Sequence, residues 1–107
     1  MAYADLRTTV MKHDWQSYPD ATCKANVVGA DYKKQCASNP ELCKPCEEMP
    51  ELSECSGDAV CVMRFRHTGP GQSRQLEVTT YGDIGQWNVH GPDSQLGVTG
   101  WALKPNH

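Results

Sequence analysis

The stretch CKANVVGADYKKQCASNPELCKPCEEMPELSECSGDAVC, residues 23–61, contains every cysteine of the chain. The six are Cys23, Cys36, Cys43, Cys46, Cys55 and Cys61. An even number of cysteines concentrated in one part of a short chain is typical of a disulfide framework. The sequence therefore predicts that all six form disulfides and that the protein folds in an oxidising compartment. The pairing itself cannot be read from the spacing.

The composition predicts a single small domain with a thin core. The chain has 107 residues, and 38% of them are hydrophobic, against about 45–50% in typical globular chains. A native disulfide in such a domain contributes about 2–5 kcal/mol, so covalent links matter to this fold. We expect one domain over residues 1–107, with a helical, cysteine-rich part at 1–57, a β-meander at 58–103 and a tail at 104–107.

Charge and hydropathy narrow the classes of partner. The formal net charge is -3, which disfavours a general binder of nucleic acid or of anionic membranes. No apolar run approaches the roughly 20 residues of a membrane span. The opening MAYADLRTTV lacks the basic and apolar regions of a leader. Because the cysteines favour export, we expect a periplasmic or extracellular mature chain whose leader has been removed.

The first half has the patterns of short helices. Apolar residues recur at helical spacing over residues 4–15, and a second helix is expected over 21–36, with Gly29 as a possible break. Asn39 followed by Pro40 is a helix-start signal for a third helix, which Pro45 limits. A further helical turn is expected from Pro50 to about residue 57.

After Gly57 the hydrophobic period changes from helical to alternating, which predicts strands. In residues 59–67, Cys61, Met63 and Phe65 share one face. Further strands are expected at 75–81, 86–90 and 96–103, separated by glycine-rich turns. The fold class is therefore α+β: disulfide-stapled N-terminal helices packed on a C-terminal antiparallel β-meander of about four strands. We expect the cysteine-rich helices to cover the apolar face of the meander, with Cys61 bridging the sheet to that helical layer.

Two kinds of cysteine chemistry compete with structural bridging. Cys43-Lys44-Pro45-Cys46 has the CxxC spacing of thiol–disulfide oxidoreductases, but no strand precedes it to place Cys43 at the start of a helix after a core strand. A structural zinc site needs a second close pair of ligands, which the sequence does not offer. We therefore favour structural bridges, in which each cysteine of the CxxC pairs elsewhere. No metal or cofactor is expected.

Acidic residues crowd the same region. Glu47, Glu48, Glu51 and Glu54 lie in a segment with few cations. They are either a solvated face or a docking surface for a basic partner, where opposite fields raise the rate and specificity of association. A calcium site is disfavoured because the segment lacks the aspartate-rich loop that binds this ion.

Histidines raise the alternative of an enzyme. His67, Glu77 and His90 fall on expected neighbouring strands, where a small secreted hydrolase or toxin could use them as acid, base and orienting groups. The alternation places His67 and Glu77 on opposite faces of the meander, however. Strand-end histidines close to water are also ordinary, so we do not assign them a catalytic role.

The tryptophans bring a family resemblance. Gly85-Gln86-Trp87-Asn88-Val89 and Gly100-Trp101-Ala102 resemble the closing part of bacterial Src-homology-3-like domains, over residues 76–103. The resemblance implies a barrel that binds cell-wall peptide or glycan, or a protein partner. The chain departs from that pattern because a single residue separates Trp87 from Val89, and the cysteine-rich half has no counterpart. Alternatively, both tryptophans fill the core.

These observations favour a secreted or periplasmic binding protein that acts by occupying a partner's surface. An inhibitor or immunity-type protein directed at an exported enzyme fits best. Its expected contact residues are Glu47, Glu48, Glu51, Glu54, Trp87 and Trp101, with the loops at Thr68–Gly71 and Gly91–Ser94 also available. Loops held by a rigid scaffold bind with a small ordering cost. The alternatives are a cell-wall-binding module and the small hydrolase.

Overall fold

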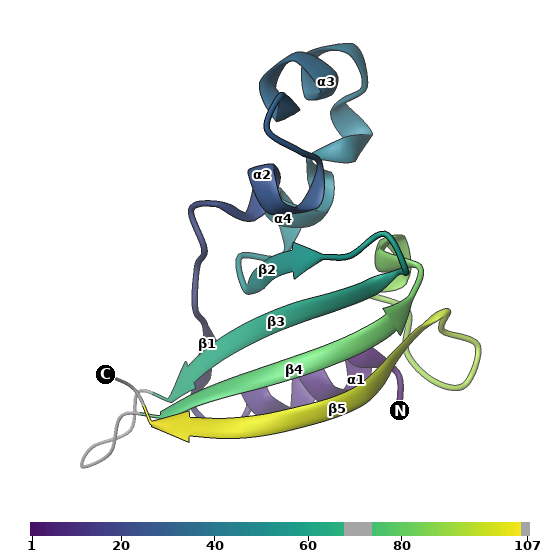
Figure 1. The fold of residues 1–107 in the computed structure, drawn as a ribbon. Helices are drawn as coiled ribbons and strands as arrows, with labels where there is room; N and C mark the ends of the chain where they lie inside the picture. The colour runs from purple at the N-terminus through teal and green to yellow at the C-terminus, as the bar shows by residue number, and fades with distance from the viewer. Residues whose placement is uncertain (68–73, 106–107) are drawn as a thin grey trace.

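A computed structural model describes residues 1–67 and 74–105 (Figure 1). Its helices are α1 (Tyr3–Met11), α2 (Cys23–Val27), α3 (Tyr32–Ser38) and α4 (Lys44–Glu48), with 3₁₀ turns η1 (Pro40–Leu42) and η2 (Ile84–Gln86). The strands are β1 (Trp15–Ser17), β2 (Leu52–Cys55), β3 (Val60–His67), β4 (Arg74–Gly82) and β5 (Leu96–Pro105). The α+β class with disulfide-stapled N-terminal helices is confirmed. No helix in the described part of the chain has the length and apolar character needed to cross a membrane.

The strands of the described residues form one antiparallel sheet in the order β1-β3-β4-β5, with β2 also paired to β3. β1 and β2 therefore share one edge of β3, where β1 pairs with residues 65–67 and β2 with residues 61–63. Arg64 lies between them. Its N–H donates to the carbonyl of Glu51 at 2.9 Å, and its carbonyl accepts from the N–H of Tyr18 at 2.9 Å. Glu51 and Tyr18 thus bond the backbone of the one residue of β3 that lies between the two short strands.

The alternating pattern of the two long strands is confirmed. Cys61, Met63 and Phe65 on β3 are buried, as are Leu76, Val78 and Thr80 on β4. Side chains at every second position of a strand point to one face. This face carries the core, which Leu52 and Leu96 complete.

Helix α1 covers this face, although it has no cysteine (Figure 1). Tyr3 is fully buried, and Leu6 and Val10 pack against the core one and two turns further along. We expected the cysteine-rich helices to supply the cover, but they reach the core near β2 through Cys23 and Met49. α2, α3 and α4 extend beyond the β2 side of the sheet.

Two expected helices are interrupted at residues with positive φ, and the break at Gly29 is the one that the sequence had allowed. The helix expected over 4–15 ends at Met11, because Asp14 adopts φ 67° and the chain turns into β1. The helix expected over 21–36 divides into α2 and α3 at Gly29, which has φ 132°. Glycine tolerates this region of backbone space because it has no Cβ.

The third helix begins as expected and then departs from the prediction. The side chain of Asn39 accepts a hydrogen bond from the N–H of Glu41, and Pro40 opens the 3₁₀ turn η1. Pro45 does not end the helical run but stands in the first turn of α4, where its missing N–H costs nothing. The helical turn expected after Pro50 is wrong: residues 52–55 form β2, which pairs with β3.

The second half of the meander also differs. Residues 86–90, expected as a strand, fall in η2 and the following turn. Asp83 caps η2 by accepting from the N–H of Gly85 at 2.9 Å, and this local bond competes with strand pairing. The described sheet has five strands because β1 and β2 come from the N-terminal half. Lys104 and Pro105, expected in a tail, pair with Gln75 and Arg74, while residues 106–107 lie outside the described part.

Candidate functional site

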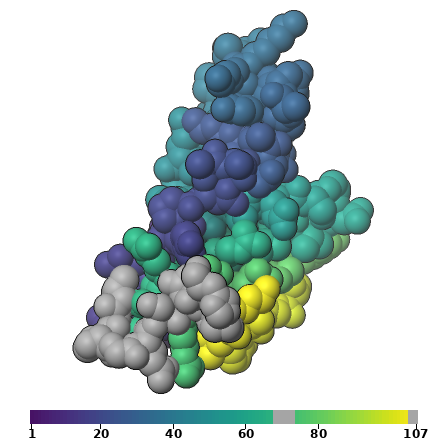
Figure 2. All heavy atoms as spheres, turned by 60° about the vertical axis from the view of Figure 1, so that its left-hand side comes forward, coloured from purple at the N-terminus to yellow at the C-terminus, as the bar shows by residue number. Residues whose placement is uncertain are grey.

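Residues 23–48 form a helical arm that projects from the β2 side of the sheet (Figures 1 and 2). The arm contains α2, α3, η1 and α4. Within this fully described segment, only Cys23 and Cys43 are buried. α3, near the tip, buries no residue. The arm therefore adds exposed surface rather than core.

All six cysteines are paired. Cys23–Cys46 joins α2 to α4, and Cys36–Cys43 joins α3 to the residue that precedes α4. The third bridge, Cys55–Cys61, links β2 to β3 within the sheet. The prediction that each cysteine of the CxxC pairs elsewhere is confirmed, whereas the expected bridge from Cys61 to the helices is wrong. Two bridges fold the arm upon itself. Three disulfides indicate an oxidising, extracytoplasmic location.

The acidic residues of the predicted contact set separate into two environments. Glu47, Glu48 and Glu54 are exposed. Glu47 forms an ion pair with Lys24, with 3.3 Å between its Oε2 and the lysine Nζ. Glu51 is fully buried. The prediction that Glu51 lies on a docking surface is therefore wrong. For the other three, a contact role stays a prediction.

Glu51 holds three elements together. Its carboxylate accepts from the hydroxyl of Tyr3 at 2.8 Å, from Nε of Arg7 at 2.6 Å and from the hydroxyl of Ser17 at 2.8 Å. These donors come from α1 and β1 and meet the residue just before β2. Burial, reinforced by the Glu51 charge, raises the pKa of the Tyr3 hydroxyl, so Tyr3 remains a donor. A run of glutamates in the sequence gave no sign that one of them would be buried.

The two predicted tryptophans also differ. Trp87 is partly buried against the core, and the guanidinium of Arg7 lies 5.0 Å from the centre of its ring. This is the geometry of a cation–π contact. Trp101 lies on β5 with 65% of its surface exposed. Trp87 thus supports the fold, and Trp101 is available to a partner.

The three candidate catalytic residues lie in separate contacts. His67 packs edge-on against Trp15 with ring centres 5.2 Å apart. Glu77, on the opposite face of the sheet from the core, accepts from Nε of Arg64 at 3.4 Å and from Nζ of Lys104 at 3.2 Å. His90 instead contacts Asp5 on α1.

Asp5 is a residue that sequence reasoning did not select. Its carboxylate binds Nδ1 of His90 at 2.7 Å and accepts from the N–H of Gly91 at 3.1 Å. The His90 hydrogen bond, followed by that from Gly91, lowers the pKa of Asp5. No spacing rule links residues this far apart in the chain, so only the fold brings them together.

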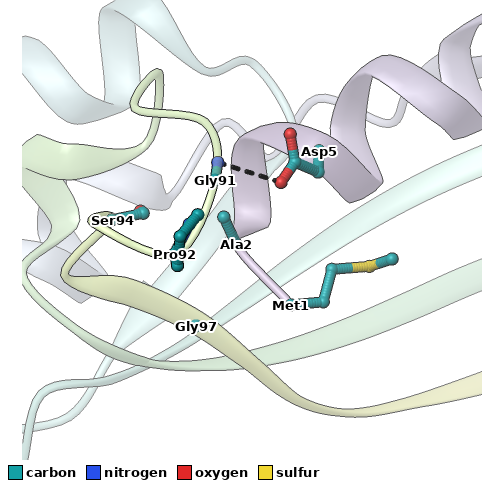
Figure 3. Close-up of a pocket in the computed structure, with 7 residues that line it drawn as sticks. All are labelled: Met1, Ala2, Asp5, Gly91, Pro92, Ser94 and Gly97. Atoms are coloured by element: carbon teal, nitrogen blue, oxygen red, sulfur yellow. Dashed lines mark hydrogen bonds between the residues drawn. The ribbon is translucent and has the colours of Figure 1, made fainter.

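Asp5 lines an open hollow of about 400 Å³ between the start of α1, the loop after His90 and β5 (Figure 3). Gly91, Pro92 and Ser94 form its loop side, so the predicted Gly91–Ser94 loop borders a concave surface. The Thr68–Gly71 loop lies outside the described residues. Among those described, no group of three or more histidine, cysteine or acidic side chains is arranged to hold a metal ion.

A smaller hollow, of about 270 Å³, lies on the arm. It is lined by Lys24, Tyr32, Lys33, Cys36, Pro40, Cys43 and Glu47. The Cys36–Cys43 disulfide is part of its lining, so the two sides of the hollow are covalently linked. Lysine and tyrosine side chains there offer cationic and aromatic contacts to an incoming group.

Comparison with known proteins finds no matching family, no matching curated protein and no matching solved structure. The resemblance of residues 76–103 to Src-homology-3-like domains therefore stays a prediction.

Proposed function

We propose that this protein works outside the cytoplasm, in the periplasm or the extracellular medium, as a binding protein that occupies the surface of an exported enzyme. Its action is that of an inhibitor or immunity-type protein. The observation that carries the proposal is the helical arm, residues 23–48, which projects from the sheet and is closed by two disulfides. The arm is the proposed contact surface.

The energetics of the arm support this role. Ordering a residue costs about 1–2 kcal/mol of backbone entropy, which burial normally offsets. The arm buries little, so its two disulfides replace core packing as the source of order. A surface that is already rigid loses less entropy when it binds. The rigidity of the arm therefore favours tight binding to a partner of matching shape.

The surface of the arm is chemically mixed. Lys33 and Lys34 are exposed on α3, Leu42 is 39% exposed on η1, and Glu47 and Glu48 are exposed on α4. Interfaces combine a hydrophobic centre with a polar rim, and the arm exposes both apolar and charged side chains. Complementary charges on the partner would direct the orientation of docking.

Competition for an enzyme tests the proposal. Immobilised protein is exposed to periplasmic and culture extracts, and each retained enzyme is then assayed with increasing amounts of the protein. We expect activity to fall to a minimum at a fixed molar ratio. Lys33→Glu, in the arm, should weaken the inhibition tenfold or more, because it reverses a charge that faces the partner.

Lys12→Glu is the matched control, since Lys12 is equally an exposed lysine but follows α1. It should inhibit as the unaltered protein does. Equal inhibition by the Lys33→Glu and Lys12→Glu variants would contradict the proposal that the arm is the contact surface. Retention on purified cell wall, with no enzyme inhibited, would favour the wall-binding alternative.

A second candidate is a hydrolase that uses the Asp5–His90 pair. A carboxylate on Nδ1 of a histidine orients the ring and leaves Nε2 to act as a base, and the 2.7 Å contact has this form. The test is His90→Gln, assayed against peptide, ester, glycan and nucleic-acid substrates. Activity lost while the circular dichroism spectrum of the folded protein is retained would support the candidate, and an inactive parent protein would dismiss it.

A further inference from the structure

Strand β5 forms one edge of the sheet, and most of its outer side is open. β4 pairs with β5 from Leu96 to Pro105, with a bulge at Thr99. On the outer side, the N–H of Val98 donates to the carbonyl of Met1 at 2.8 Å, and Ala2 bridges Gly97. Among the residues that the structure describes, no strand pairs with the outer side of residues 99–105. Unpaired strand edges are templates for pairing with another chain.

Two rows of core side chains run across the sheet and onto this open strand. One row is Met63–Val78–Trp101, and the other is Phe65–Leu76–Leu103. The members on β3 and β4 are buried, but Trp101 is 65% exposed and Leu103 is 47% exposed. The apolar face therefore extends beyond its cover, on the strand whose backbone is also unpaired.

We propose that this edge binds a second copy of the same chain, with the two β5 strands antiparallel and a two-fold axis at Ala102. The open segment, residues 99–105, has Ala102 at its midpoint, so this pairing uses the whole open length of both copies. It also preserves the faces of both sheets, because residues opposite each other then have the same orientation. Each copy is recognised through the unpaired backbone groups and the exposed apolar side chains of its own β5.

The side chains are complementary in this register. Trp101 of each copy stands opposite Leu103 of the other, so the two apolar rows continue from one sheet into the next. Aromatic and aliphatic cross-strand pairs stabilise sheets. On the opposite face, Lys104 stands opposite Gly100, so the two lysines are not opposed. Each Lys104 also remains within reach of Glu77 in its own chain, which it contacts at 3.2 Å.

The contact is small, so the dimer should be reversible. A tryptophan buries about 150–250 Å², and two tryptophans and two leucines bury less than the roughly 1,200 Å² at which stable interfaces begin. We therefore expect monomer at low concentration and dimer at high concentration. Sedimentation equilibrium should show the average mass rising from 11.8 kDa towards twice that value.

Charge substitution tests the surface. Trp101→Lys should keep the protein monomeric at every concentration, because it places charge in the apolar row. Tyr81→Lys is the matched control, because Tyr81 is 59% exposed on the neighbouring strand but lies on the opposite face of the sheet. The Tyr81→Lys protein should dimerise normally. A parent protein that stays monomeric, or a dimer that survives Trp101→Lys, would overturn the proposal.

Cysteine substitution tests the register. The two Ala102 positions lie directly opposite, about 4.5–5.5 Å apart between Cα atoms, which suits a disulfide. Ala102→Cys should therefore form a covalent dimer in air. Thr99→Cys is also exposed, but its two copies would lie about 20 Å apart and should not cross-link. Cross-linking of Thr99→Cys in preference to Ala102→Cys would contradict the axis.

This inference is independent of the helical arm. Lys33→Glu should leave the dimer intact, because Lys33 lies on the arm and not on β5. Failure of one proposal is thereby distinguished from failure of the other.

Discussion

The carboxylate of Glu51 lies inside the molecule, where it receives hydrogen bonds from α1 and β1. A buried ion pair adds little net stability when intact, because desolvation opposes the attraction. Removing one member is costly, since the other charge then lacks its partner. The Arg7 side chain is 22% exposed, so water partly stabilises its charge and reduces the free energy lost when Glu51 is removed.

We predict that Glu51→Gln lowers the free energy of unfolding by about 3 kcal/mol, the lower end of the range for breaking a buried pair. Because glutamine has nearly the same size as glutamate, the loss of stability measures the contribution of the Glu51 charge. Urea denaturation measures it. Glu54→Gln, at an exposed position, should change stability by less than about 0.5 kcal/mol. Equal losses in the two variants would show that the buried network contributes nothing.

The contact of Asp5 predicts a pH dependence. Its pKa is lowered in the folded protein, first by the hydrogen bond with His90 and then by that with Gly91. A carboxyl with a lowered pKa contributes stability above its unfolded pKa of about 3.9, and this contribution disappears as the pH falls through the folded value.

We therefore expect Asp5→Asn to melt at a lower temperature than the parent at pH 6, with the difference closing below about pH 4. Thermal melts at several pH values provide the measurement. A difference that stays constant from pH 6 to pH 2 would mean that ionisation of Asp5 plays no part in stability.

At the scale of elements, the arm and the sheet are stabilised differently. The sheet buries alternating side chains beneath α1, whereas α3 buries none and is attached by Cys36–Cys43. Cys23–Cys46 closes a larger loop, with a sequence separation of 23 against 7. In the chain-entropy account, longer loops give more stabilisation.

Removing each bridge should thus have a different effect. Cys23→Ala with Cys46→Ala should cost about 3 kcal/mol of unfolding free energy, and Cys36→Ala with Cys43→Ala about 2 kcal/mol. The second variant should nevertheless be cut faster by trypsin at Lys33 and Lys34, because α3 loses its attachment. Denaturation and timed digestion measure the two effects. Unchanged cleavage there would show that α3 is ordered by other contacts.

The whole molecule is thin, with principal extents of 45 × 33 × 20 Å. In the described residues, helix α1 on one sheet, plus the arm, encloses a small core. Small domains retain only about 5–15 kcal/mol of net stability, and a disulfide contributes about 2–5 kcal/mol. The three bridges are therefore comparable with the whole stability of the fold.

We predict that complete reduction unfolds the protein at 37 °C. Circular dichroism should lose its folded signal in reductant, and the oxidised protein should take up no alkylating agent in mass spectrometry, since all six cysteines are paired. A reduced protein that keeps its spectrum and melting temperature would show that the core suffices without the bridges.

Some of this architecture could be predicted from the sequence because it depends on local signals. The alternation in β3 and β4, the start signal at Asn39-Pro40 and the pairing state of the cysteines all follow from spacing. The prediction of a strand over residues 86–90 was wrong because the local cap by Asp83 outweighs a short apolar pattern. β1 and β2 were missed because strands of this length carry little periodicity and form only by pairing with β3.

The candidate surfaces divide in the same way. The sequence by itself determined the α+β class, the use of all cysteines in bridges and the oxidising location, because composition and periodicity act over many residues. Only the tertiary structure decided that Glu51 is buried, that residues 23–48 project, and that Trp101 lies on an open edge. Burial and edge exposure depend on which distant segments meet, and no local pattern contains that information.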